Sequence, residues 1–165
     1  MTKTSAILGS IAFFIIAPGT VAGVLPWLIS KWEFAAPLLG LEASRLIGAL
    51  LIILGLIPLV DSFRRFAWEG LGTPAPVLPT QRLVVTGFYR HVRNPMYVGV
   101  IAVVLGQSIL FGNAALLASA AIVWLGFHTF VTAYEEPTLK RTYGAGYEAY
   151  CQNVPRWLPR LSGMR

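Results

Sequence analysis

The sequence predicts an all-α, polytopic membrane protein with about four transmembrane helices, a tight C-terminal helical hairpin and a cytoplasmic cofactor pocket. Hydrophobic residues make up 56% of the 165 residues and charged residues only 12%, whereas soluble domains carry about 25% charged residues. The charges are also segregated, which leaves uncharged windows long enough to cross a bilayer. We expect a single domain over residues 1–165, with N-terminal spans and a loop in 1–80 and a core over 81–160.

The N-terminal part is predicted to contain two spans. Residues 4–30 carry no charge and suffice for one tilted crossing at about 20 residues, with a kink at Pro18-Gly19. This run is too long for a signal peptide, so no cleavable signal is expected. A second span is predicted over residues 41–60. The charged and aromatic stretch 61–68 should then lie at the headgroup level.

The segment between the second span and the core is predicted to be non-helical. Residues 70–79 contain three prolines and favour an extended loop. Residues 81–86 favour a short extended segment that leads into the core.

The core contains a long window, residues 94–134, with no formal charge and one histidine. It is about twice the length of one crossing, so it predicts two helices. The first helix should begin at Pro95, which lacks a backbone N–H and suits the first helical position. A turn at residues 111–113 would make the two helices antiparallel, and their far ends would therefore meet on one side of the membrane.

The residues after this hairpin predict an amphipathic helix over 137–150, weakened by Gly144 and Gly146. Four side chains are expected to share its apolar face: Leu139, Tyr143, Tyr147 and Tyr150.

The charge distribution predicts the topology. With four spans and both termini on one side, eleven of the 13 lysines and arginines fall on that side, and only Lys31 and Arg45 fall on the other. Basic residues favour the cytoplasmic side, so both termini and the core are predicted to be cytoplasmic. The net charge of +6 then indicates topology and contact with anionic lipids rather than nucleic-acid binding. The single cysteine, Cys151, excludes an internal disulfide and a CxxC metal site, and no metal is expected.

Polar residues gather at both ends of the predicted hairpin. Arg93, Asn94 and Tyr97 lie at its start, and Glu135 and Glu136 lie at its end. Taken singly, each suits a membrane anchor or a solvated group. Because the antiparallel hairpin brings all five to one membrane edge, where polar groups need partners, they predict a ligand site.

These residues resemble the isoprenylcysteine carboxyl methyltransferase family. Gly87-x-Tyr89 followed by Arg93-Asn94-Pro95-Met96-Tyr97 is similar to the RHPxY block of that family. The C-terminal motifs, EExxL from Glu135, YGxxYxxY from Tyr143 and VPRWLP from Val154, resemble its C-terminal signature. The resemblance covers residues 81–160. RHPxY alone is weak, because membrane sterol reductases carry a similar block, but the two blocks together are specific.

The resemblance implies an integral membrane methyltransferase that uses S-adenosylmethionine. Backbone groups around Pro95 would receive the carboxylate of the cofactor, aromatic rings would stack on its adenine, and Glu135 would pair with its amine or a ribose hydroxyl. The cofactor-binding residues implied are Gln81, Arg82, Leu83, Val84, Tyr89, Asn94, Pro95, Met96, Tyr97, Glu135 and Glu136. Arg93 is expected to anchor the loop or pair with Glu136.

The sequence departs from the family at two positions. Asn94 stands where the motif has histidine, which keeps hydrogen bonding but removes a titratable group. Val131 stands where the family has an arginine for the substrate carboxylate. His128, seven residues before Glu135, shares a predicted helical face with it and is a candidate for substrate contact or proton acceptance. A histidine bonded to a neighbouring helix is the structural alternative.

Three functions stay open from the sequence. The first is methyl transfer to a lipophilic or small acceptor, which includes prenylcysteine, an amine such as a phospholipid, a quinone-like hydroxyl or a thiol. The second is a sterol-reductase-like membrane enzyme that uses NADPH, and the third is a scaffold without catalysis. The source organism, the oligomeric state and the effect of Asn94 on activity are not indicated.

Overall fold

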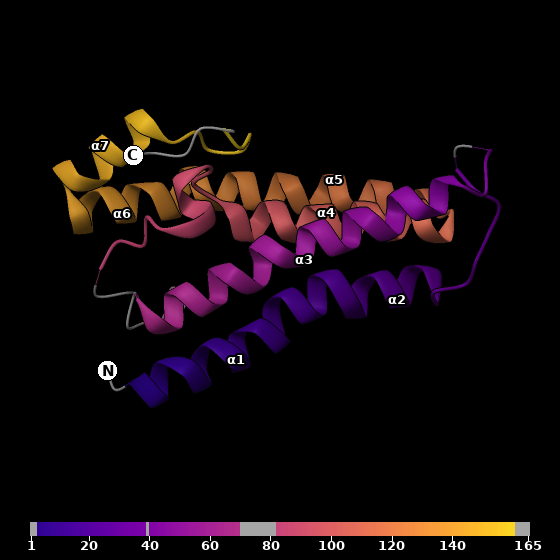
Figure 1. Ribbon diagram of the computed structural model, residues 1–165, viewed down its shortest axis with the longest axis horizontal. Coiled ribbons are helices and arrows are strands. Elements are labelled where there is room, and N and C mark those ends of the chain that lie inside the picture. Colours follow the sequence, from indigo (N-terminus) through magenta and orange to yellow (C-terminus); the bar gives the residue numbers. More distant parts are fainter. Residues whose placement is uncertain (1–2, 39, 70–81, 161–165) are drawn as a thin grey trace.

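The computed structural model describes residues 3–38, 40–69 and 82–160 (Figure 1). Every regular element in these ranges is a helix and none is a strand, which confirms the all-α prediction. Three helical stretches are long and apolar enough to cross a membrane, and they cover Ile7–Ser30, Ser44–Trp68 and Ala114–Tyr143. The apolar helix Pro95–Phe111 is shorter, so the count of four crossings stays a prediction. The predicted loop over 70–79 lies outside the described residues.

The first span is one long helical path interrupted by a wide turn. It consists of α1 (Lys3–Gly19), a π-helical turn η1 (Thr20–Val24) and α2 (Leu25–Ser30). The turn directly follows the predicted kink, because Pro18 cannot donate the backbone hydrogen bond that would continue a regular helix. The amide of Gln107, from a neighbouring helix, donates to the carbonyl oxygen of Ala22 in this turn at 2.7 Å.

The second span, α3 (Ser44–Trp68), is longer than predicted. The helix does not end near residue 60 but continues through the charged stretch 61–68. Asp61, Arg65 and Glu69 are spaced four residues apart, and Arg65 pairs with both carboxylates at 2.7 Å. Ion pairs at this spacing lie on one helical face and stabilise the helix, which explains the extension.

The core begins with a short 3₁₀ helix, η2 (Gly87–Arg90), and an antiparallel hairpin, α4 (Pro95–Phe111) and α5 (Ala114–Phe130). The predicted helix start at Pro95 is confirmed. The predicted turn is also confirmed, because Gly112 ends α4 with a left-handed backbone conformation and the side chain of Asn113 accepts from the N–H of Ala115. Residues 82–86 contain no regular element.

Helices α3 and α4 pack antiparallel at very close range through two pairs of glycines. Gly48 of α3 lies against Gly106 of α4. Gly55, seven residues later in α3, lies against Gly99, seven residues earlier in α4. A Cβ atom placed on Gly55 would lie 2.7 Å from the carbonyl oxygen of Gly99, and one on Gly99 would lie 2.6 Å from the carbonyl oxygen of Gly55. Glycines let membrane helices approach closely enough for backbone contact, and these four fix the position of α4.

The C-terminal part corrects two predictions. The second arm of the hairpin does not end at Tyr134 but continues through a π-helical turn, η3 (Val131–Glu135), into α6 (Glu136–Tyr143). The predicted single helix over 137–150 is divided at Gly144, whose φ of 53° starts α7 (Ala145–Asn153) in a new direction. The predicted aromatic face is nevertheless brought together, since Tyr147 and Tyr150 pack with Leu139 and Tyr143.

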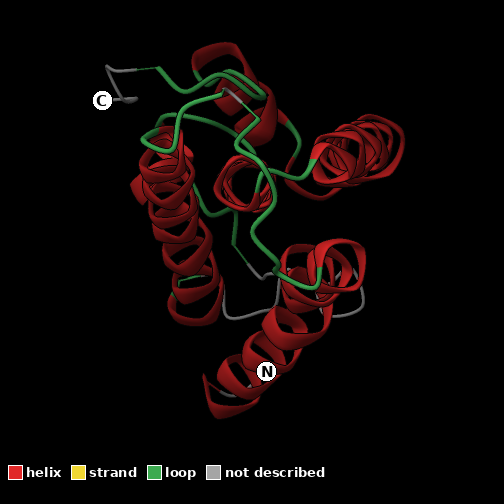
Figure 2. Ribbon diagram, turned by 90° about the vertical axis from the view of Figure 1, so that its right-hand side faces the viewer, coloured by secondary structure: helices red, strands yellow, loops and turns green. Residues whose placement is uncertain are grey.

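The two ends of the bundle differ. Figure 1 shows the start of α1, the end of α3, η2, α6 and α7 at one end, while the α2–α3 and α4–α5 connections lie at the other. At that other end the N–H of Ala35 donates to the carbonyl oxygen of Phe111 at 2.9 Å, and Arg45 donates to the carbonyl oxygen of Leu110 at 2.7 Å. Figure 2, turned by 90° from Figure 1, shows some helices end-on and others at a slant, with loops crossing between them.

Candidate functional site

The loop before α4 is held by the C-terminal segment of the chain. The backbone N–H of Arg93 donates to the carbonyl oxygen of Pro155 at 2.8 Å, and the N–H of Arg160 donates to the carbonyl oxygen of His91 at 3.0 Å. Between these contacts, the side-chain amide of Asn94 donates to the carbonyl oxygen of Arg156 at 3.0 Å. Asn94 therefore keeps a hydrogen-bonding role at the position where the motif has histidine, as predicted.

Glu136 is neutralised by two arginines. Arg93 Nη1 lies 2.9 Å from its carboxylate, and Arg156 donates to both of its oxygens at 2.7 and 2.9 Å. The hydrogen bond to Glu136 raises the pKa of the Arg156 guanidinium, so this pair stays charged. The predicted pairing of Arg93 with Glu136 is confirmed, and it ties α6 to both the loop and the C-terminal segment.

Glu135 has a different environment, although it is the next residue. Its carboxylate accepts a hydrogen bond from the hydroxyl of Tyr97 at 3.0 Å, and within the described ranges no lysine or arginine pairs with it. The ring of Tyr97 packs on Phe127 of α5, with 4.6 Å between ring centroids. Glu135 ends the π-helical turn η3 and Glu136 begins α6, and the two neighbouring glutamates have different partners.

Tyr89 in η2 lies between α3 and α7. Its ring packs on Phe66 of α3 with centroids 5.7 Å apart, and its carbonyl oxygen accepts from the hydroxyl of Tyr150 in α7 at 2.7 Å. Burial raises the pKa of the Tyr150 phenol, so the hydroxyl stays protonated and remains the donor. Helices α3 and α7 thus hold η2 from two sides.

These elements enclose a cavity at the α6–α7 end of the bundle. The cavity is open on one side, and the space measures about 940 Å³ when its open mouth is included. The residues that line it are Phe66, Leu83, Val84, Tyr89, Arg93, Asn94, Met96, Tyr97, Glu135, Glu136, Thr138, Leu139, Thr142, Tyr143, Tyr147 and Tyr150.

Most of the predicted cofactor-binding residues meet in this cavity. Those that line it are Leu83, Val84, Tyr89, Asn94, Met96, Tyr97, Glu135 and Glu136. Pro95 is fully buried at the start of α4, next to the lining residues. Arg82 is exposed and does not line the cavity, and Gln81 lies outside the described residues. The binding roles themselves stay predictions.

The structure does not bring His128 into the cavity. Its ring stacks on Trp124 with 5.3 Å between centroids, and its Nδ1 accepts from the indole N–H of Trp157 at 3.3 Å. The shared helical face with Glu135 assumed a regular helix, whereas the π-helical turn between them changes the register. Trp157 lies in the irregular segment after α7 and not on a neighbouring helix, so the contact differs from the structural alternative. The catalytic role of His128 stays a prediction.

Several lining residues were not among the predicted binding residues. Phe66 lies in the part of α3 beyond the predicted end of the second span at residue 60. The predicted boundary therefore gave no reason to include it in the site. Thr138 and Thr142 lie on α6 beside the aromatic face. That face was visible in the sequence, and its apolar spacing could have placed Tyr147 and Tyr150 in the site.

A second cavity adjoins the first within the apolar part of the bundle. It lies between α1, η1, α4 and α5, and Met96 and Tyr97 line both cavities. Its other lining residues are Phe13, Ala17, Pro18, Val21, Val100, Phe127 and Phe130. Except for the hydroxyl of Tyr97, these side chains are apolar.

Comparison with known sequences identifies similar proteins. Residues 43–146 match the family described as phospholipid methyltransferase. The chain is 37% identical over 80 residues to a protein-S-isoprenylcysteine O-methyltransferase of Schizosaccharomyces pombe, covering 48% of this chain and 34% of the relative. It is 34% identical over 79 residues to protein-S-isoprenylcysteine O-methyltransferase B of Arabidopsis thaliana, covering 47% and 40%. It is also 33% identical over 99 residues to the Delta(14)-sterol reductase LBR of Gallus gallus, covering 58% and 16%.

Proposed function

Because the chain belongs to the phospholipid methyltransferase family, we propose that it is an integral membrane methyltransferase that binds S-adenosylmethionine in the cavity at the α6–α7 end. The alignments with the two isoprenylcysteine methyltransferases span between a third and two fifths of those proteins. We therefore infer the activity, cofactor and acceptor of this chain from its own residues.

The observation that carries the proposal is the state of the charges in the cavity. The Glu135 carboxylate accepts from the hydroxyl of Tyr97, and no lysine or arginine of the described residues pairs with it. The buried Nε of Arg93 has no acceptor among the described residues. S-adenosylmethionine carries an ammonium, a sulfonium and a carboxylate. A carboxylate without a cation and a donor without an acceptor fit these groups, and the aromatic walls fit its adenine.

The residues of the chain have separate tasks in this proposal. Bound S-adenosylmethionine supplies an activated methyl group, so the protein has to align the reactants and exclude water. Glu135 and Tyr97 hold a cationic group, the first-turn amides of α4 and Arg93 receive a carboxylate, and Tyr89 and Tyr147 line the aromatic part. Glu136 pairs with Arg93 and Arg156 and stabilises the wall of the cavity.

The second cavity provides a place for a lipophilic acceptor. Because Met96 and Tyr97 line both cavities, an apolar chain in the second cavity would bring its polar end to the boundary with the first. Val131 is fully buried. Arg93, the one basic residue that lines the described cofactor cavity, pairs with Glu136 and is already assigned to the carboxylate of the cofactor. We therefore propose an acceptor without a carboxylate, such as a lipid with an amine or hydroxyl group.

The two other functions have less support. The phosphate of NADPH calls for clustered basic residues, and within the described lining only Arg93 is basic. The LBR alignment covers 16% of that sterol reductase. A scaffold without catalysis would not require the Glu135 carboxylate, with which no described lysine or arginine pairs. Such a group between apolar helices is costly unless a ligand pairs with it.

The topology of the proposed enzyme follows from the basic residues. Lys31 follows α2 and Arg45 lies in the first turn of α3, and the α2–α3 connection is at the end of the bundle opposite the cavity. Most of the other described basic residues, among them Arg64, Arg93 and Lys140, lie at the cavity end. Basic residues are enriched on the cytoplasmic side. We propose that the cavity opens to the cytoplasm.

If the second cavity holds the acceptor, a substitution in it should weaken acceptor binding and leave cofactor binding unchanged. Replacing Ala17 by phenylalanine fills part of the second cavity, so the KM for a lipophilic acceptor should rise about tenfold, in keeping with a lost apolar contact of roughly 1–2 kcal/mol. The affinity for S-adenosylhomocysteine should not change. Transfer of labelled methyl groups from S-adenosylmethionine into membrane lipids, with amine- and hydroxyl-bearing lipids tested separately, gives this measurement.

The matched control is Ala12→Phe, at an exposed position of the same helix, which should leave the KM unchanged. Equal KM values for Ala17→Phe and Ala12→Phe would contradict the acceptor cavity. A wild-type enzyme that labels no lipid, but labels an added carboxylate, would contradict the proposed acceptor class.

A further inference from the structure

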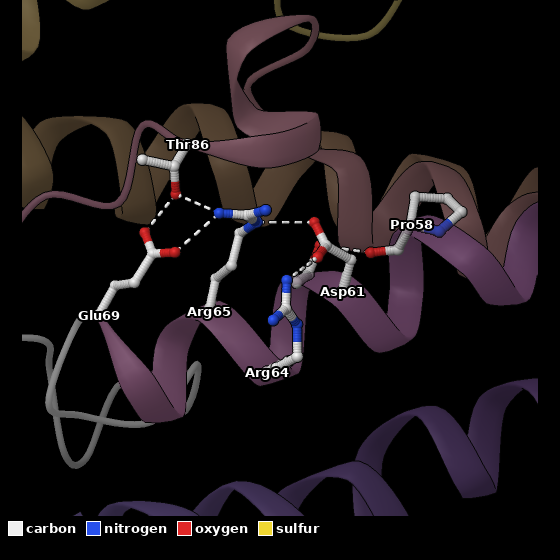
Figure 3. A network of polar contacts seen from close by, with 7 residues as sticks. Pro58, Asp61, Arg64, Arg65, Glu69 and Thr86 are labelled. Atoms are coloured by element: carbon white, nitrogen blue, oxygen red, sulfur yellow. Dashed lines mark hydrogen bonds and ion pairs between the residues drawn. The ribbon is translucent and has the colours of Figure 1, made fainter.

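A network of charged side chains lies beside the cofactor cavity, outside its lining (Figure 3). We propose that Arg65 at its centre is a positioning residue, which fixes the cavity wall formed by residues 83–89 and thereby sets the affinity for the cofactor. This inference rests on the proposed function.

Arg65 joins α3 to the loop that precedes η2. Its Nε donates to Asp61 at 2.7 Å, and its Nη1 donates both to Glu69 at 2.7 Å and to the hydroxyl of Thr86 at 2.7 Å. The Thr86 hydroxyl in turn donates to Glu69. The side chains of Arg65 and Asp61 are each only 17% exposed, so the guanidinium is held from several directions and partly shielded from solvent.

The loop also contacts Arg65 at Gly87. Gly87 has a φ of 56°, a left-handed conformation that glycine adopts without strain. A Cβ at this position would collide with Nε, Cζ and Nη2 of Arg65. The guanidinium therefore lies directly on the backbone of Gly87, in addition to its bond with Thr86.

Thr86 and Gly87 lie between two lining residues, Val84 and Tyr89. The N–H of Tyr89 donates to the carbonyl oxygen of Thr86 at 3.1 Å, which transmits the position of Thr86 to the ring of Tyr89. Fixing residues 86 and 87 thus fixes a lining residue on each side. Arg65 itself does not line the cavity, so any effect on the cofactor has to act through this wall.

Arg64 provides a matched control on the same helix. It carries the same charge and pairs with the same partner, Asp61, at 3.0 Å, but its side chain is 61% exposed. In Figure 3 its guanidinium is directed at Asp61, and no dashed line joins it to Thr86. A general loss of positive charge at this end of α3 would affect both arginines equally, whereas a positioning role belongs to Arg65.

The test is calorimetric binding of S-adenosylhomocysteine to the detergent-solubilised full chain, with thermal unfolding measured on the same samples. Arg65→Gln and Thr86→Val should each raise the dissociation constant about tenfold. Because the two residues act in one network, the double variant should have no higher a dissociation constant than the single variant that binds less tightly. Arg64→Gln should bind like the wild type.

Unchanged affinity in Arg65→Gln and Thr86→Val, with only a lower unfolding temperature, would overturn the inference, because Arg65 would then serve stability alone. If Arg65→Gln does not fold, Thr86→Val decides the matter, since it removes one hydroxyl and keeps every charge. Failure of the wild type to bind S-adenosylhomocysteine would contradict the proposed function and with it this inference, so the two failures are distinguishable.

Discussion

Replacing Glu135 by glutamine is expected to raise the dissociation constant for S-adenosylmethionine by about a hundredfold. Its carboxylate is bonded to Tyr97 and faces the cavity without a basic partner within the described ranges. A hydrogen bond to a charged group contributes about 1.5–3 kcal/mol, and the ligand would also lose the charge that balances its cation. Calorimetry on the solubilised variant measures the change directly.

A comparison of two ligands sharpens this prediction. S-adenosylhomocysteine keeps the ammonium but lacks the sulfonium, so an equal loss for both ligands would place the ammonium at Glu135, and a larger loss for S-adenosylmethionine would place the sulfonium there. Glu148→Gln is the control, because this carboxylate pairs with Lys140 at 2.7 Å outside the cavity lining. Equal affinities of Glu135→Gln and Glu148→Gln would exclude Glu135 from the site.

Replacing Gly55 by leucine is expected to prevent the native packing of α3 on α4. Even a Cβ would lie 2.7 Å from the carbonyl oxygen of Gly99 and 2.9 Å from the Cβ of Ala102, so the helices would have to separate. Overpacking costs typically about 1–3 kcal/mol for a few added atoms, and Gly55→Ala should show a loss of this size. Thermal unfolding in detergent measures both variants.

Gly126 is the matched control for Gly55. It lies in α5, and a Cβ there would meet nothing within 4 Å. Gly126→Ala should leave the protein as stable as the wild type or more stable, because alanine favours a helix by about 1 kcal/mol over glycine. If Gly55→Ala and Gly126→Ala unfolded at the same temperature, the close approach of α3 and α4 would be refuted.

Much of the site was predictable because its residues follow simple local rules of sequence and structure. Pro95 at a helix start, a turn at Gly112 and an uncharged window of two crossings together predict an antiparallel hairpin. Such a hairpin has to bring Tyr97 near Glu135, and the structure has this contact.

Three features were not predicted, each for a different reason. The charges of residues 61–68 suggested the end of a span, but ion pairs four residues apart extend α3 to Trp68. The π-helical turn over Val131–Glu135 has no sequence rule as simple as that for proline, and it removes His128 from the face of Glu135. The second cavity depends on the packing of α1 against α4 and α5, which no single segment encodes.

The most direct test of the proposed function is calorimetric titration of the solubilised wild-type chain with S-adenosylmethionine and, separately, with NADPH. The charges and aromatic walls of the cavity predict saturable binding of S-adenosylmethionine and no binding of NADPH. Folded protein that binds NADPH instead, or that binds neither ligand, would contradict the assignment as a methyltransferase.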